Sequence, residues 1–110
     1  MEKLQRYRDI LSRIVREYAR KPSHGNIDAE AVIDRENDHY EVVHVGWDKQ
    51  RRVHGSVIHL DIRDGKIWLQ YDGTSRPVAD ELLEAGVPKE DIVLGFQPEH
   101  LRPLTGFGGV

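Results

Sequence analysis

The sequence predicts a small α+β domain: an N-terminal helix, an antiparallel four-stranded β-meander, then a second helix and a short C-terminal helical turn. Three observations predict this fold. Apolar side chains recur at helical spacing over residues 2–20, alternating apolar and polar residues follow between positions 27 and 71, and Asp64-Gly65 marks a tight hairpin. A chain of 110 residues has room for one hydrophobic core, so we expect a single domain over residues 1–110.

The composition is that of a globular chain, with 38% hydrophobic and 32% charged residues. No apolar run approaches the ~20 residues that cross a bilayer, and Met1 to Leu4 lack the apolar region of a secretory signal. The absence of cysteine excludes disulfides, thiolate nucleophiles and thiolate metal ligands together. We therefore expect a cytoplasmic protein that does not associate with membranes.

Residues 2–20 predict an amphipathic helix of about five turns. Its apolar side chains recur three and four residues apart, as on one face of a helix, and they are Leu4, Tyr7, Leu11, Ile14 and Tyr18. Pro22 disfavours helical geometry at Lys21, so we expect the helix to end there.

Three strands are expected next. Residues 27–33 alternate apolar and polar side chains, as in a strand with one wet face. Residues 39–47 and 53–63 are rich in β-branched and aromatic residues, which favour strands. The short polar loop between these two strands indicates that His44 opposes Gly55.

The Asp64-Gly65 pair predicts a two-residue type I′ turn, because both positions need a positive φ. This turn sets the register of the hairpin. The pairs expected on the core face are Ile62/Ile67, Leu60/Leu69 and Ile58/Tyr71. The pairs expected on the opposite face are Asp61/Trp68, His59/Gln70 and Val57/Asp72.

A second helix and a final helical turn complete the predicted fold. Pro77 suits the first turn of a helix, and Gly86 suits its left-handed end. Residues 87–94 are expected to form a turn and an apolar segment. Pro98 opens one last helical turn, which Pro103 ends.

Six histidines raise the question of a metal site. Residues five apart on a strand point to opposite faces, so neither His54 and His59 nor His39 and His44 converge. No His-x-His pattern on a strand and no His-x-x-x-His pattern on a helix supplies two ligands to one ion. We therefore expect no metal site and no cofactor, and we interpret the histidines as hydrogen-bonding surface groups.

The sequence also lacks a recognisable catalytic pattern. No serine stands in a Gly-x-Ser-x-Gly context, and no glycine-rich loop suited to phosphates occurs. His59 and Asp61 share one strand face and could serve a small hydrolase as an acid–base pair. An ordinary ion pair on a solvated face explains them as well, so we expect no catalytic residues and no enzyme.

Charge is unevenly placed along the chain. Residues 1–21 carry seven cations against three acids, a balance of +4, and the remainder carries nine cations against sixteen acids, a balance of −7. The basic stripe, which could follow a phosphate backbone, consists of Arg6, Arg13, Arg16 and Arg20. Because the net charge is −3, we interpret this stripe as a solvated helix face and expect any contact with nucleic acid to be indirect.

The hairpin face opposite the core is interrupted by apolar side chains, and Val42 is expected to add to them. Antiparallel sheets commonly leave one face exposed to solvent, so apolar side chains on that face indicate that another segment or another protein packs over them. Either the C-terminal segment, residues 92–104, lies over this face or a partner protein does. The candidate partner face is formed by Val57, His59, Asp61 and Trp68.

Several motifs follow one another along essentially the whole chain. They are Tyr7-Arg8, Tyr18, Val45-Gly46-Trp47, Arg52-Val53-His54-Gly55, Ile58 to Ile62, Asp64 to Trp68, Gly86 to Phe96 and Thr105-Gly106-Phe107. In this order they resemble the XisI family, the fdxN element excision controlling factors. Residues 74–78 and 108–110 are less typical of that family.

The resemblance implies an XisI-like fold and a controlling role in the excision of a DNA element. In cyanobacteria this excision is a programmed DNA rearrangement of heterocyst differentiation. The resemblance also implies a nuclease-like companion, XisH, while the recombinase is a separate protein. No catalytic residue is established for XisI-type proteins, so the implied role is protein–protein interaction.

Two hypotheses from different classes follow. The first is a non-enzymatic accessory factor that binds an XisH-like partner and controls its action on DNA. The alternative is a regulatory protein that binds DNA directly through the basic stripe. An exposed sheet edge and a partly apolar face are also consistent with a homodimer.

Overall fold

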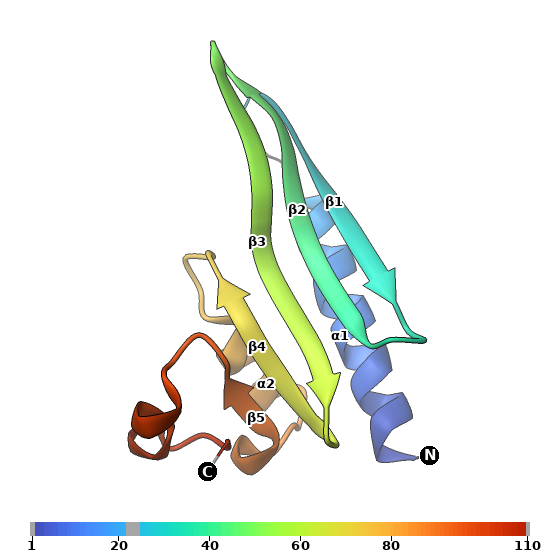
Figure 1. Cartoon of the computed structure of the whole chain (residues 1–110). Helices are drawn as coiled ribbons and strands as arrows, with labels where there is room; N and C mark the ends of the chain where they lie inside the picture. Colours follow the sequence, from blue (N-terminus) through green and yellow to red (C-terminus); the bar gives the residue numbers. More distant parts are fainter. Residues whose placement is uncertain (1, 22–24, 110) are drawn as a thin grey trace.

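The first element of the fold is helix α1, Lys3–Arg20, which lies along the sheet in this computed structural model (Figure 1). The structure describes residues 2–21 and 25–109. The helix buries the predicted apolar stripe, including Tyr7, Leu11 and Ile14. It ends where predicted, because Lys21 has an extended backbone with ψ of 139°. Pro22, to which that ending was ascribed, lies outside the described residues.

The predicted meander is confirmed as the first four strands of the sheet. These strands are antiparallel neighbours in sequence order, and they are β1 (Asn26–Asp34), β2 (His39–Asp48), β3 (Arg51–Arg63) and β4 (Lys66–Asp72). His44 opposes Gly55, as the loop between the strands predicted. The far ends of β2 and β3 project beyond the body of the molecule (Figure 1).

A fifth strand, β5 (Ile92–Leu94), adds to the sheet beyond β4 and runs parallel to it. From the sequence, only an apolar segment was expected here. Three residues are too few to show the alternation that marks a strand. The parallel pairing also depends on the crossover through α2 (Val78–Glu84), which returns the chain to the same edge.

The second helix and the C-terminal turn are confirmed, both with a proline directly before their first residue. Pro77 precedes α2, and Pro98 precedes the 3₁₀ segment η2 (Glu99–Thr105). Pro103 lies inside η2, which continues to Thr105, so the expectation that Pro103 ends the turn is wrong. A short 3₁₀ turn, η1 (Lys89–Asp91), leads into β5. Within residues 2–21 and 25–109, none of the helices is both long and apolar enough to cross a membrane.

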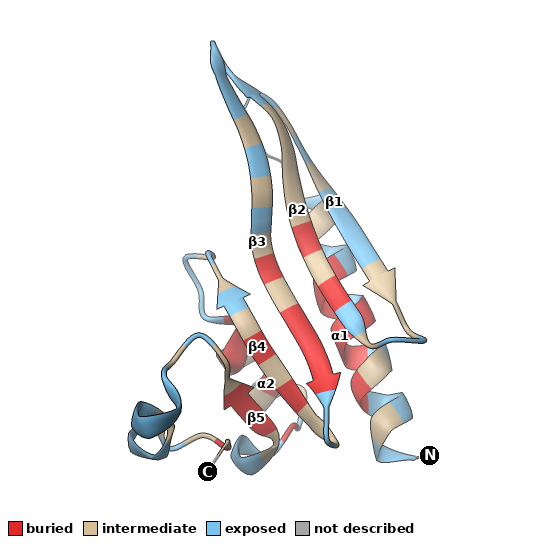
Figure 2. Ribbon diagram, viewed as in Figure 1, coloured by how far each residue is buried: buried red, intermediate tan, exposed pale blue. Residues whose placement is uncertain are grey.

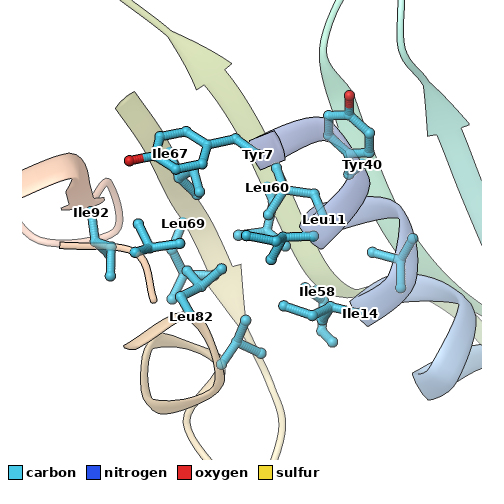
Figure 3. Close-up of a cluster of buried hydrophobic side chains, with 14 of the residues drawn as sticks. Tyr7, Leu11, Ile14, Tyr40, Ile58, Leu60, Ile67, Leu69, Leu82 and Ile92 are labelled. Carbon is cyan, nitrogen blue, oxygen red and sulfur yellow. The ribbon is translucent and has the colours of Figure 1, made fainter. Parts of the chain in front are cut away.

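The hydrophobic core lies between the two helices and one face of the sheet. Tyr7, Leu11 and Ile14 of α1 and Leu82 of α2 point toward the strands (Figure 3). The sheet contributes Tyr40, Val42, Ile58, Leu60, Ile67, Leu69 and Ile92. Truncating one such buried leucine or isoleucine to alanine costs about 2–5 kcal/mol. Figure 2 shows that the buried positions gather away from the projecting strand ends, which are exposed.

The hairpin turn is of type I′, as predicted, with φ of 53° at Asp64 and 75° at Gly65. Next to the turn, the expected pairs Ile62/Ile67, Asp61/Trp68 and Leu60/Leu69 are confirmed. Beyond them the register shifts, so that His59 opposes Tyr71 and Ile58 opposes Asp72. The expected pairs Ile58/Tyr71, His59/Gln70 and Val57/Asp72 are therefore wrong.

One β-bulge accounts for these β3–β4 shifts and a second shifts the register between β2 and β3, since a bulge adds one unpaired residue to a strand. Gln70 is the extra residue of β4, between the pairs Leu60/Leu69 and His59/Tyr71. Val57 is the extra residue of β3, between the pairs Val42/Ile58 and Val43/Ser56. Each bulge changes which face the following residues occupy.

Candidate functional site on the outer face of the sheet

Both helices pack on one face of the sheet, and we call the opposite face the outer face (Figure 1). Its centre is a polar cluster of four side chains contributed by three adjacent strands. The cluster consists of His39 of β2, His59 and Asp61 of β3, and Gln70 of β4. This polar cluster is the candidate site.

Asp61 is the hub of the polar cluster. Its Oδ1 atom lies 2.7 Å from His39 Nδ1 and 2.9 Å from His59 Nε2, while Gln70 Nε2 donates to Oδ2 at 3.2 Å. An ionised carboxylate only accepts hydrogen bonds, so both imidazole nitrogens must carry a proton and donate it. The Asp61 side chain is 9% exposed, against 57% for His39 and 34% for His59.

The electrostatics of the polar cluster favour an ionised Asp61. Burial works to raise the pKa of this carboxyl, but the hydrogen bond from His39, the charge of His59 and the hydrogen bond from Gln70 together hold the pKa below its usual value. The hydrogen bond to Asp61 in turn raises the pKa of His39 above the usual value for histidine. Asp61 therefore offers a buried negative charge that cationic groups stabilise.

His39 and His59, a pair that the spacing arguments did not consider, meet at one oxygen atom of Asp61. Spacing along a single strand could not reveal this pair, which forms across two strands. The bulge at Val57 is decisive. Extending the His44/Gly55 register to the start of β2 would place His39 opposite Leu60, on the core side, whereas the bulge places it opposite Asp61.

The candidate partner face is only partly assembled in the structure. His59, Asp61 and Trp68 share the outer face, where Asp61 and Trp68 are directly opposed on β3 and β4. Val57 instead packs against the hydrophobic core, and the expectation that it lies beside them is wrong. Val42 was expected on the outer face as well, but it is 1% exposed in the core.

Trp68 lies between two arginines. The Arg63 and Arg102 guanidinium carbons are 5.1 and 5.2 Å from the centre of its ring, within the range of cation–π interactions. Because Arg102 belongs to η2, the C-terminal segment covers part of Trp68. The indole nitrogen Nε1 is buried without a hydrogen-bond partner among the described residues.

Three of the four arginines of the basic stripe lie together. Arg13, Arg16 and Arg20 line one hollow of about 260 Å³ on α1, which Arg35, directly after β1, completes. Two acids, Asp9 and Glu17, line the same hollow, and Asp9 accepts a hydrogen bond from Arg35 at 2.8 Å. Arg6 lies outside this hollow and lines a neighbouring one together with Arg13, and its guanidinium carbon is 5.5 Å from the ring centre of Tyr7. Arg35 was missed because it joins the stripe through the tertiary fold.

Two crystal structures are similar to this chain over nearly its full length. A XisI-like protein from Anabaena variabilis ATCC 29413 is 40% identical, with a TM-score of 0.91 over 97% of this chain and 99% of that one. The fdxN element excision controlling factor XisI from the same organism is 34% identical, with a TM-score of 0.84 over 99% of this chain and 100% of that one. Among curated proteins, none matches the sequence.

The fold and the sequence motifs lead to the same assignment. The XisI protein family matches residues 1–109, and the helix–meander–helix architecture is that of the XisI-like structures. The chain belongs to the XisI family.

Proposed function

We propose that this chain is a non-enzymatic controlling factor that binds a nuclease-like protein of the XisH type and controls its action on a DNA element. The observation that carries the proposal is the full-length similarity to the fdxN element excision controlling factor XisI, at 34% identity. In this role the chain works in the cytoplasm and reaches DNA through its partner. Its contribution is recognition of a protein surface.

We place the partner contact on the outer face, around His59, Asp61 and Trp68. Two features support this placement. Trp68 and the arginines that flank it combine a large aromatic surface with positive charge, and tryptophan and arginine are the residues most enriched among interface anchors. The exposed Arg63 at the end of β3 brings cationic charge to the edge of this surface, which suits an acidic partner patch.

Co-purification with the XisH-like companion from the same organism tests the proposal. Arg63→Glu reverses a charge on the outer face and removes the guanidinium over Trp68. Arg51→Glu makes the same charge change on the same strand, at its far end. We expect Arg63→Glu to reduce the recovered complex at least about tenfold, as for an interface anchor, and Arg51→Glu to leave it unchanged. Equal recovery with both variants would exclude the outer face, and no complex with the unaltered chain would exclude the partner.

A second candidate function is direct DNA binding through the helix. It is favoured by one observation, the convergence of Arg13, Arg16, Arg20 and Arg35 on a single hollow. Four guanidinium groups in one place suit a phosphate better than a dispersed stripe does. The two acids in the same hollow and the net charge of −3 weigh against this function.

A further inference from the structure

We propose that His39, His59 and Asp61 form a binding site for a divalent transition-metal cation of the Zn²⁺ class. Each residue offers one ligand atom, and the three atoms lie within 4.8 Å of one another. Imidazole nitrogen and carboxylate oxygen are ligands that suit zinc and its neighbours in the transition series. The proposed site goes beyond the partner contact and does not depend on it.

The present geometry lies close to that of a metal centre. Bonds of about 2.0–2.1 Å in a tetrahedral arrangement place ligand atoms about 3.3 Å apart. The two contacts to Asp61 Oδ1, at 2.7 and 2.9 Å, are at hydrogen-bond length and need to widen by about half an ångström. His39 has the freedom for this adjustment, since its side chain is 57% exposed and its strand begins at this residue.

Charge and burial also favour a cation at this position. The Asp61 carboxylate is almost fully buried, and an isolated buried charge is costly unless a cation or several donors stabilise it. The two imidazole N–H groups now serve that purpose. A divalent cation can take the place of these two N–H groups and neutralise the carboxylate more fully. A neutral imidazole binds it after its proton moves to the other ring nitrogen, whereas an imidazolium must first lose a proton, so binding weakens as pH falls.

Residues around Asp61 orient its carboxylate by hydrogen bonding, as the neighbours of metal ligands commonly do. Gln70 Nε2 donates to Asp61 Oδ2, the oxygen not facing the histidines, and so fixes the orientation of the carboxylate. Gly95 makes room for Gln70, since a Cβ there would overlap its Oε1 atom. Three protein ligands leave a fourth position for water or for a group supplied by a partner.

Zinc titration of the tag-free protein by isothermal calorimetry tests this site, with Co²⁺ absorption as a second readout of nitrogen–oxygen coordination. The unaltered chain should bind one Zn²⁺ per molecule. His39→Ala should weaken binding at least about tenfold, in line with the cost of losing one group of a metal site. His54→Ala removes an exposed histidine from the same strand as His59 and should have no effect.

Two results of the titration would overturn the proposal: no binding by the unaltered chain, or equal affinity of the His39→Ala and His54→Ala variants. Circular dichroism confirms that each variant is folded. Because His39 lies at the surface, its replacement leaves the core intact, and a His39→Ala/His59→Ala double variant gives an independent check. That variant should abolish the Co²⁺ spectrum, and retention of the spectrum would place the metal elsewhere. The titration uses the chain alone, so its outcome is independent of whether a nuclease-like partner binds.

Discussion

Asp61 lies directly opposite His39 in the β2–β3 ladder, and the two side chains are joined at 2.7 Å. This pairing depends on the bulge at Val57, which shifts the register of β2 and β3 by one residue. The same carboxylate also contacts His59, two residues earlier on β3, so the bulge adds a second imidazole to a contact that already exists within one strand. The outer face thereby gains a cationic–anionic cluster that the unshifted register would not form.

The stability of the protein should depend on pH through His39. Its pKa is raised in the folded state by Asp61, with smaller contributions from Asp34 and Asp38. The stabilisation is therefore fully present below the unfolded pKa of about 6.5 and is lost as pH rises through the folded pKa. Asp61 has a lowered pKa, so its contribution persists above about pH 4 and is lost as pH falls through the folded value.

The free energy of unfolding, measured in urea at about pH 6 and about pH 8.5, should fall between the two pH values in the unaltered chain. It should fall less in His39→Gln, which lacks the imidazolium. His54→Gln serves as the matched control and should retain the full pH dependence. An identical pH dependence in His39→Gln and the unaltered chain would mean that Asp61 does not stabilise the His39 imidazolium.

Gly46→Ala should separate β1 from β2. A Cβ at Gly46 would overlap the carbonyl oxygen of Asn26 and the backbone of Ile27, so one strand must move away. We expect a loss of about 1–3 kcal/mol in the free energy of unfolding, as for other overpacked positions. Gly55→Ala is the control, because its Cβ would meet no atom within 4 Å. Comparable urea midpoints for the two variants would contradict the close approach at Gly46.

Tyr7→Phe should loosen the contact between α1 and η1. The Tyr7 hydroxyl donates to Asp91 Oδ2 at 2.5 Å, and burial together with this hydrogen bond raises the pKa of Tyr7 to about 12. Removing the hydroxyl should cost about 1 kcal/mol in the free energy of unfolding. Tyr71→Phe, at a half-exposed tyrosine of β4, should cost almost nothing. Thermal or urea unfolding of the two variants in parallel provides the comparison.

Direct DNA binding through the helix can be tested by gel shift at low and moderate salt. If Arg13 and Arg16 contact phosphates, Arg13→Glu/Arg16→Glu should abolish a salt-sensitive shift, because each lost contact lowers the salt dependence by about one unit of slope. Arg51→Glu/Arg52→Glu changes charge equally at the start of β3 and should leave the shift intact. No shift with the unaltered chain would exclude this function.

The elements predicted correctly are those with strong local signals. The helix from Lys3 to Arg20 has a regular apolar spacing, and Asp64-Gly65 has a turn chemistry that few other pairs share. The misassigned residues depend on the bulges. The residues around Val57 give no sign that it is unpaired, because a bulge depends on how two twisted strands pair and pack in the folded sheet. The convergence of His39 and His59 depends on that bulge and was therefore hidden as well.

The C-terminal end of the sheet differs from its beginning in a way that limits how copies of the chain could assemble. Two amides from the same chain cover the outer side of β5, since Gly108 N–H donates to the Ile92 carbonyl at 2.8 Å and Gln97 N–H to the Leu94 carbonyl at 3.0 Å. Among the described strands, β5 therefore has two of its carbonyl groups already engaged within the chain, which disfavours addition of a strand from another copy at that edge. Protection of an edge strand in this way reduces edge-to-edge aggregation of sheet proteins.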